Sequence, residues 1–235
     1  MRPSNTPATA AKAPTRGDAV FDAIVDLIHD CERAPGMVVN ETALAARFNV
    51  SRGPVREAIR RLQGIQLVSR APYMRARVVS LSRQAILELF QAREALEGFA
   101  CRLATQRMTD VELVRLIADL DGARGRKALA GGRFDFHQSI VRASGNQRII
   151  DMLCGDLYHL LRIYRRMSGA LPKRKELALA EHWQIIRAIK SRDAELAESL
   201  MRSHIARAAR HVLDHVPSVS RGVGNGIELR GTDHV

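Results

Sequence analysis

Three arginines recur at every fourth position in one short stretch of the chain, and this spacing suits nucleic-acid recognition. Arg52, Arg56 and Arg60 would share one face of a helix, because residues four apart lie above one another on a helix. A guanidinium can donate two hydrogen bonds to guanine O6 and N7 in the DNA major groove, and it also neutralises phosphates. The stripe therefore predicts a helix that binds double-stranded DNA.

The residues around this stripe predict a helix-turn-helix. Asn40 can cap a first helix, and Ser51 can cap a second helix that carries Pro54 in its first turn, where the missing N–H costs nothing. The apolar side of the second helix recurs at helical spacing: Val55, Ile59 and Leu62. In this motif the second helix enters the major groove with its N-terminus first, so Arg52 and Arg56 are expected to reach base edges.

Two short strands are expected after the second helix, at residues 67–70 and 77–80, and such a hairpin is the wing of a winged helix. Arginines dominate residues 47–77, where Glu57 is the one acidic residue, so DNA affinity should depend steeply on salt. Thr42, Ser51 and Arg75 are expected near phosphates or the minor groove. Gly53, Pro54 and Arg60 complete the expected DNA-binding set. The alternative is that these arginines only solvate a helix surface.

Composition favours an intracellular protein with a polyanionic partner. The formal net charge is +12, although much of the excess lies outside the expected winged helix. The cysteines at 31, 101 and 154 are odd in number and form no Cys-x-x-Cys pair, which argues against a disulfide framework and a zinc ribbon. No secretory signal or membrane span is apparent, so a cytoplasmic location without a membrane partner is expected.

Composition and periodicity divide the chain into two expected domains, in a fold that is mostly α. Residues 1–17 are expected to be a disordered tail, residues 18–80 the winged helix-turn-helix and residues 81–86 a linker. Residues 87–216 are expected to form an antiparallel all-α bundle, and residues 217–235 a flexible tail. A first helix is expected at 18–29, and Ser82 would cap the first bundle helix, which has Phe99 on its buried side. One continuous helix, capped by Asn146, would cover 146–168.

The winged helix resembles that of the GntR family of bacterial transcription regulators. Residues 49–62, from Asn-Val-Ser-Arg-Gly-Pro to Arg-Arg-Leu, are similar to its recognition-helix signature. The bundle resembles the FCD-type ligand-binding domain of the FadR subfamily, on the following residues: Arg93-Glu-Ala-Leu-Glu97, Phe136-His137, Ala143-Ser-Gly-Asn146, Glu181-His182 and His204. The resemblance implies a homodimeric regulator that is not an enzyme, binds a palindromic operator and responds to a small carboxylate effector. Repression is expected rather than activation.

The resemblance also implies a divalent-metal site on separate helices of the bundle. The family's three histidines match His137, His182 and His204, but its aspartate, one helical turn before the first histidine, is replaced by Arg133. Three imidazoles can still bind zinc or nickel, with water or an effector carboxylate completing the coordination. Alternatively, the guanidinium of Arg133 repels a dication and binds the effector carboxylate directly. Asp135 is two residues from His137, so a regular helix would direct it elsewhere.

Two further residues are expected at the effector site. Arg93 matches a family arginine that faces the cavity, so it could bind an effector carboxylate; the alternative is an intrahelical ion pair with Glu97. His211 lies on the same face of the last helix as His204 and could be an auxiliary pocket residue or a half-exposed one.

The sequence leaves two other classes of protein to weigh. Inward histidines in a bundle also occur in ferritin-like metalloenzymes, but the Glu-x-x-His pairs of those enzymes are absent around these histidines. A non-regulatory architectural DNA binder is the other alternative.

Two positions depart from the GntR pattern: Gln66 precedes Leu67 where the family usually has glycine, and Ala76 replaces a glycine of the wing tip.

Overall fold

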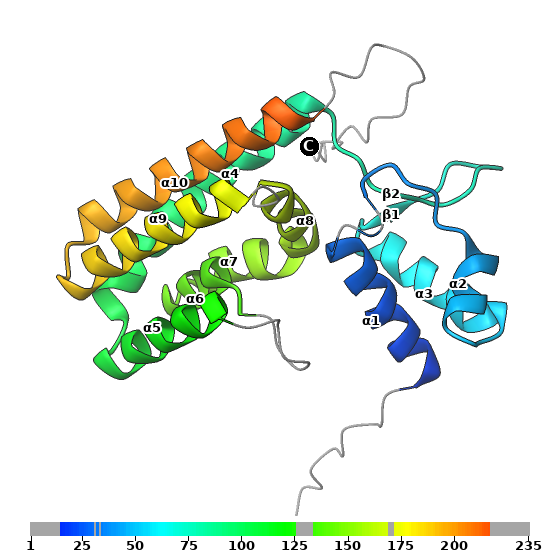
Figure 1. Cartoon of the computed structure of the whole chain (residues 1–235), viewed down its shortest axis with the longest axis horizontal. Helices are drawn as coiled ribbons and strands as arrows, with labels where there is room; N and C mark the ends of the chain where they lie inside the picture. The colour runs from blue at the N-terminus through cyan, green and yellow to red at the C-terminus, as the bar shows by residue number, and fades with distance from the viewer. Residues whose placement is uncertain (1–14, 31, 33, 126–133, 169–171, 217–235) are drawn as a thin grey trace, which may run out of the picture. The chain divides into compact units, whose positions relative to one another are not determined.

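A computed structural model describes residues 15–30, 32, 34–125, 134–168 and 172–216 (Figure 1). The described chain is mostly helical and divides into two compact units, one ending at Val79 and one beginning at Ser80. The expected tails at 1–17 and 217–235 lie almost entirely outside the described residues, as do Cys31 and Arg133. Arg16 and Gly17 were expected in the first tail, but they form the first turn of a helix.

In its described residues the first unit contains three helices, α1 Arg16–His29, α2 Glu41–Arg47 and α3 Arg52–Gly64. α1 begins two residues earlier than expected because Thr15 and Asp18 form a capping box, in which each side chain accepts from the other residue's backbone N–H. The core of this unit is almost inaccessible to solvent and includes Ile24, Leu44, Val55, Ile59 and Leu62. Burial of these side chains fixes α1 and α2 against α3.

α2 and α3 form the expected helix-turn-helix. The Asn40 side chain accepts from the backbone N–H groups of Thr42 and Ala43, which confirms it as a cap. Asn49 supplies the turn with a left-handed φ of 51°. The expected cap at Ser51 is only partly correct, because Ser51 has the extended backbone of a cap but its side chain makes no capping hydrogen bond.

A two-stranded antiparallel hairpin follows α3. β1 Val68–Ser69 pairs with β2 Arg77–Val78, with Val68 opposite Val78. The strands are shorter than the expected four residues each. Gln66, which stands where the family usually has glycine, adopts φ 56°. The chain therefore keeps the left-handed turn at the end of α3 without the residue that adopts it most easily.

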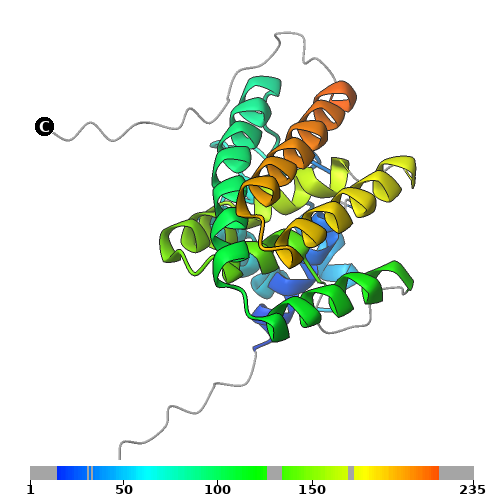
Figure 2. The ribbon, with the colours of Figure 1, turned by 90° about the vertical axis from the view of Figure 1, so that its left-hand side faces the viewer.

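The second unit is a helical bundle. Its segments are α4 Arg83–Arg107, α5 Asp110–Gly125, α6 Phe136–Ala143, α7 Gln147–Ile150, the π-helix η1 Asp151–Asp156, α8 Tyr158–Ser168, α9 Pro172–Lys190 and α10 Ala194–His215. α4 and α10 are antiparallel and lie side by side in both views of the ribbon (Figures 1 and 2). Ser82 caps α4 as expected, since its hydroxyl oxygen accepts from the Ala85 N–H.

The expectation of one continuous helix over 146–168 is wrong. Asn146 caps α7 as expected, but after one turn the chain forms η1, in which the Leu157 N–H donates to the Met152 carbonyl five residues earlier. Gly155 lies in this turn, where its low helix propensity favours a departure from regular α-helix. α8 then begins in a new direction and brings Leu161 and Tyr164 into the core.

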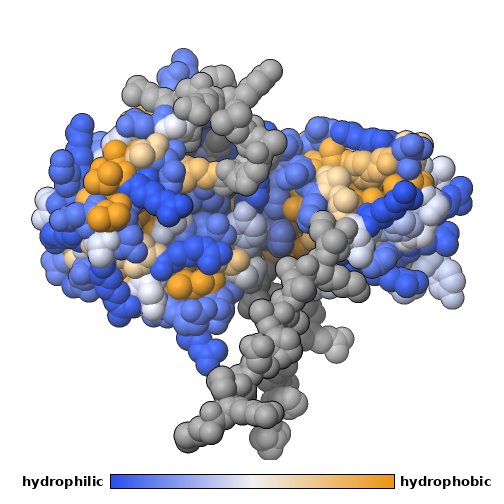
Figure 3. Space-filling view, turned by 90° about the horizontal axis from the view of Figure 1, so that it is seen from below, coloured by the Kyte–Doolittle hydropathy of each residue, from blue (hydrophilic) through white to orange (hydrophobic). Residues whose placement is uncertain are grey.

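On the face that Figure 3 shows, the surface is largely hydrophilic, with separate hydrophobic patches. Phe99 of α4 was expected to be buried, but 44% of it is exposed, because α10 packs against the neighbouring Gly98 side of the helix. Among the described helices, none is long and apolar enough to cross a membrane.

Candidate DNA-binding surface and histidine site

The recognition helix α3 has one buried and one exposed side. Val55, Ala58, Ile59 and Leu62 are buried, whereas Arg52, Arg56 and Arg60 are exposed. The other expected DNA-binding residues are also accessible: Thr42, Ser51, Gly53 and Arg75 are exposed and Pro54 is half-buried. This exposed stripe, at the N-terminal end and along one side of α3, has the charge and access that contact with a duplex requires.

Four arginines of this unit, at positions 47, 56, 61 and 70, have acidic partners that the local sequence does not predict. Arg56 and Arg70 both donate to the carboxylate of Glu41, at 3.0 and 2.5 Å. Arg61 donates to Asp18 at 2.7 Å and lies 4.1 Å from the centre of the Phe21 ring. Glu41 and Asp18 lie outside the arginine-rich stretch, so only the fold brings these carboxylates to it.

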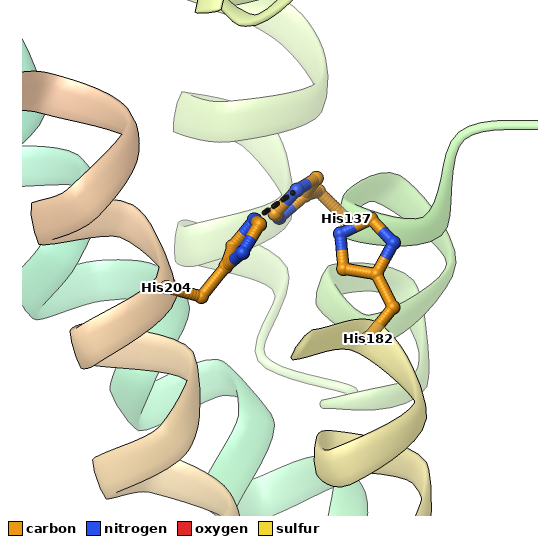
Figure 4. A group of neighbouring side chains, drawn as sticks. All are labelled: His137, His182 and His204. Atoms are coloured by element: carbon orange, nitrogen blue, oxygen red, sulfur yellow. Dashed lines mark hydrogen bonds between the residues drawn. The ribbon is translucent and has the colours of Figure 1, made fainter. Parts of the chain in front are cut away.

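The second unit brings His137 of α6, His182 of α9 and His204 of α10 together, although they are far apart in the sequence (Figure 4). Their nitrogen donor atoms all lie within 4.8 Å of one another. The Nε2 atoms of His137 and His204 are 3.3 Å apart. His182 Nε2 is buried and has no hydrogen-bond partner among the described residues.

One buried and one partly buried carboxylate, those of Glu97 and Glu181, orient two of these rings. Glu97 accepts from Nδ1 of His137 at 2.6 Å, and Glu181 accepts from Nδ1 of His204 at 2.5 Å. A neutral imidazole that donates from Nδ1 keeps only a lone pair on Nε2. The two Nε2 lone pairs therefore face each other across 3.3 Å, an arrangement that a cation between them would stabilise.

The electrostatics keep these rings neutral. Burial lowers the pKa of His137 to about 4, holds the pKa of His182 well below its usual value and lowers the pKa of His204. Burial would raise the pKa of Glu181, but the hydrogen bond from His204 and its arginine neighbours lower it to about 2. Neutral imidazoles backed by ionised carboxylates are the form that binds metal ions.

This donor set fits a divalent transition metal. Two ligands on a tetrahedral ion with bonds of about 2.1 Å lie about 3.4 Å apart, close to the spacing of the His137 and His204 Nε2 atoms. Carboxylates that hold the opposite ring nitrogens are typical of metal-ligating histidines. Asp135 is not part of the set, because it caps α6 and pairs with Arg165 at 2.9 Å.

Arg93 borders the histidines and forms the ion pair that was weighed against effector binding. Its Nε donates to Glu97 at 2.6 Å, and its Nη2 lies 3.2 Å from His137 Nδ1. Its side chain is 1% exposed, yet Nη1 is buried without a hydrogen-bond partner among the described residues. An uncompensated buried N–H is costly, so this atom is suited to bind an anion in the bundle. His211 is half-buried, and its ring centre lies 4.3 Å from that of His215, tilted by 42°, instead of joining the cluster.

Together these features define a class of protein: a winged-helix DNA-binding regulator with a second, all-helical domain. Family models match both parts, the gntR family of bacterial regulatory proteins at residues 16–78 and the FCD domain at residues 88–207. The chain belongs to the GntR family of transcription regulators and is not an enzyme.

Known relatives agree with this assignment. The chain is 31% identical to the uncharacterized HTH-type transcriptional regulator YdhC of Bacillus subtilis, over 77% of this chain and 84% of that protein. It is 30% identical to a probable D-xylose utilization operon transcriptional repressor of Paenarthrobacter nicotinovorans, over 82% of this chain and 86% of that protein. The crystal structure of a GntR regulator from Rhodococcus sp. RHA1 shares the fold, with a TM-score of 0.69 and 24% sequence identity. The match covers 86% of this chain and 99% of that chain.

Proposed function

We propose that this regulator represses transcription by binding a palindromic operator as a homodimer. We further propose that a small carboxylate, bound beside a metal ion in the second unit, releases the regulator from the operator. The observation that carries the proposal is the facing pair of His137 and His204 Nε2 atoms, 3.3 Å apart, beside Arg93, whose buried Nη1 has no hydrogen-bond partner in the described part of the chain. Repression is supported by the name of the D-xylose operon relative.

Arg52 and Arg56 are the proposed base-reading residues. Both are exposed on the first turns of α3, the part of a recognition helix that approaches base edges. Thr42, Ser51, Arg60 and Arg75 would hold phosphates or the minor groove, and Gly53 and Pro54 would allow the close approach of the helix to the backbone. Most contacts of such a surface position the protein and do not read the sequence.

The metal would be held by His137, His182 and His204. When bound, a zinc or nickel ion would supply an open position that can accept a carboxylate oxygen. Arg93 would bind the same effector through Nη1, because a guanidinium matches the geometry of a carboxylate. Arg133 and His211 remain secondary candidates for effector contact. Basic side chains close to the cluster, such as Arg174 and Arg207 on Glu181, also favour an anionic ligand.

A homodimer interface on α4 and α10 is the proposed means of pairing two recognition helices. Phe99 is 44% exposed on α4, and the adjacent surface alternates Glu94, Arg102, Glu195 and Arg202. A surface with both charges can pair with its own copy about a two-fold axis. Effector binding would change the separation of the two recognition helices and so weaken operator binding.

A selection from randomised duplexes, followed by fluorescence anisotropy on the selected duplex, tests the DNA-binding proposal. Arg52→Ala and Arg56→Ala should each cost about 1–3 kcal/mol of binding free energy. Arg115→Ala, on α5 of the bundle, is the matched control and should leave affinity unchanged. Wild-type affinity in both recognition-helix variants would contradict the proposed register of α3 on DNA.

A further inference from the structure

We infer that Glu41 is a positioning residue for DNA recognition: it fixes the guanidinium groups of Arg56 and Arg70 and so determines how Arg56 meets a base. This inference rests on the proposed role of Arg56 as a base-reading residue. Glu41 would not contact a base itself.

One carboxylate connects three elements of the winged helix. Glu41 is the first residue of α2, Arg56 lies on α3, and Arg70 directly follows β1. Glu41 Oε2 accepts from Arg56 Nε at 3.0 Å, while Oε1 accepts from Arg70 Nη2 at 2.5 Å. Each oxygen therefore holds one guanidinium, and a change at Glu41 would release an arginine of the recognition helix and an arginine of the wing together.

The hydrogen bond from Arg56 to Glu41 leaves the two terminal nitrogens of the Arg56 guanidinium available for a base. Glu41 uses Nε, whereas Nη1 and Nη2 form the end of the guanidinium fork, whose donors match guanine O6 and N7. The Arg56 side chain is 59% exposed and the Glu41 side chain 20% exposed. The carboxylate therefore lies beneath the outer surface and supports a side chain that extends from it.

The ionised form of Glu41 is favoured by the same contacts. Hydrogen bonds from Arg70, and then from Arg56, lower the pKa of Glu41 below its usual value. The three groups together carry one net positive charge instead of the two of a bare arginine pair. Glu41 therefore weakens attraction to any phosphate backbone while it orders the side chain that distinguishes sequences, a combination that favours specificity over general affinity.

A simple structural role would have a different consequence. A carboxylate that only stabilised the fold would, when removed, lower binding to every duplex by the same factor. A positioning residue should instead change the ratio of affinities between the selected duplex and a shuffled duplex of the same composition. It should act only when Arg56 is present.

The experiment measures this ratio by anisotropy for the full chain and for Glu41→Gln, over a series of salt concentrations. We expect the ratio to fall about tenfold, within the range of one bidentate base contact. Affinity for the shuffled duplex should rise, and its salt slope should steepen by about 0.9, because a released arginine can neutralise one more phosphate. In an Arg56→Ala background, Glu41→Gln should change the ratio less than twofold.

Glu32→Gln is the matched control. Glu32 pairs with Arg47 of α2 at 2.9 Å in the same unit, so this variant removes the same charge without touching α3 or the wing. Its ratio should stay within twofold of wild type. If Glu41→Gln does not fold, Glu41→Asp, which keeps the charge but shortens the side chain, is judged by the same criterion.

An unchanged ratio in the folded Glu41 variant, or the same loss in Glu32→Gln, would overturn the inference while leaving the proposed function intact. A wild-type protein that selects no sequence at all would overturn the proposed function, and the inference with it.

Discussion

Glu181 offers a quantitative test of the proposed metal site, because it orients His204, a proposed ligand, without being a ligand itself. Its Oε2 accepts from His204 Nδ1 at 2.5 Å, which fixes the tautomer that leaves Nε2 free to coordinate. Glu181→Gln keeps the size of the side chain but removes the charge and offers only one oxygen. Loss of such a partner weakens metal affinity about 10–100-fold, or about 1.4–2.8 kcal/mol.

The assay is competition for Zn²⁺ with a chromophoric chelator at neutral pH, on the purified full chain. Glu195→Gln is the control, since the Glu195 side chain is 82% exposed and pairs with Arg102, at 3.3 Å. His204→Ala should lose more affinity than Glu181→Gln, because it removes the ligand itself. Equal zinc affinity in wild type, Glu181→Gln and His204→Ala would refute the assignment of this cluster as a metal site.

Three further predictions concern the winged helix, the proposed dimer interface and the proposed effector site. Hydrogen bonds from Thr15, and then from Arg61, lower the pKa of Asp18 to about 2. The Asp18 carboxylate is therefore protonated at a lower pH in the folded chain than in the unfolded chain. Its contribution to the free energy of unfolding is complete above pH 3.8 and is lost as the pH falls toward 2. The difference in urea midpoint between wild type and Asp18→Asn should shrink over that range; a constant difference would contradict the capping role. Phe99→Ala should weaken dimerisation at least tenfold in sedimentation velocity, whereas Val111→Ala, at an exposed apolar site on α5, should not; equal dissociation constants would contradict the interface. His182→Ala should keep DNA affinity within twofold but lose the change that Zn²⁺ and a panel of small carboxylates cause in wild type, and a retained response would contradict the effector site.

Local signals in the sequence were sufficient for most of the fold. Asn40 and Ser82 were predicted as caps from residue type and position, and the structure confirms both. Periodicity also separated the buried and exposed sides of α3. The exact ends of helices and the breaks within them were harder to predict. The capping box at Thr15 extends α1, and the π-helix η1 is a change of backbone hydrogen bonding that the hydrophobic periodicity does not indicate.

The candidate sites show a similar division. The three histidines were identified through the resemblance, and the structure brings them together. The role of Glu97 could be predicted only as a partner of Arg93, four residues away, since its contact with His137 joins residues 40 positions apart. Glu181 is adjacent to His182 in the sequence but accepts from His204 instead. Glu41 gave no signal, because nothing in its local sequence indicates that Arg56 and Arg70 converge on it.

Phe99 illustrates a limit of hydrophobic periodicity as a guide to burial within one chain. Its spacing on α4 predicts burial, and within one chain the prediction is wrong because 44% of the residue is exposed. The hydrophobic pattern of a helix does not distinguish a side that packs within the chain from one that packs on another copy. The proposed interface explains this difference.

The most direct test of the central claim, that α3 reads DNA through its exposed arginines, is to sequence the duplexes selected by three proteins in parallel. The account predicts that wild type selects a palindrome whose half-sites lie about one helical turn apart. Arg52→Ala and Arg56→Ala should each lose base preference at a different pair of symmetric positions, with the rest of the palindrome retained. An identical consensus in all three selections, or no consensus for wild type, would contradict it.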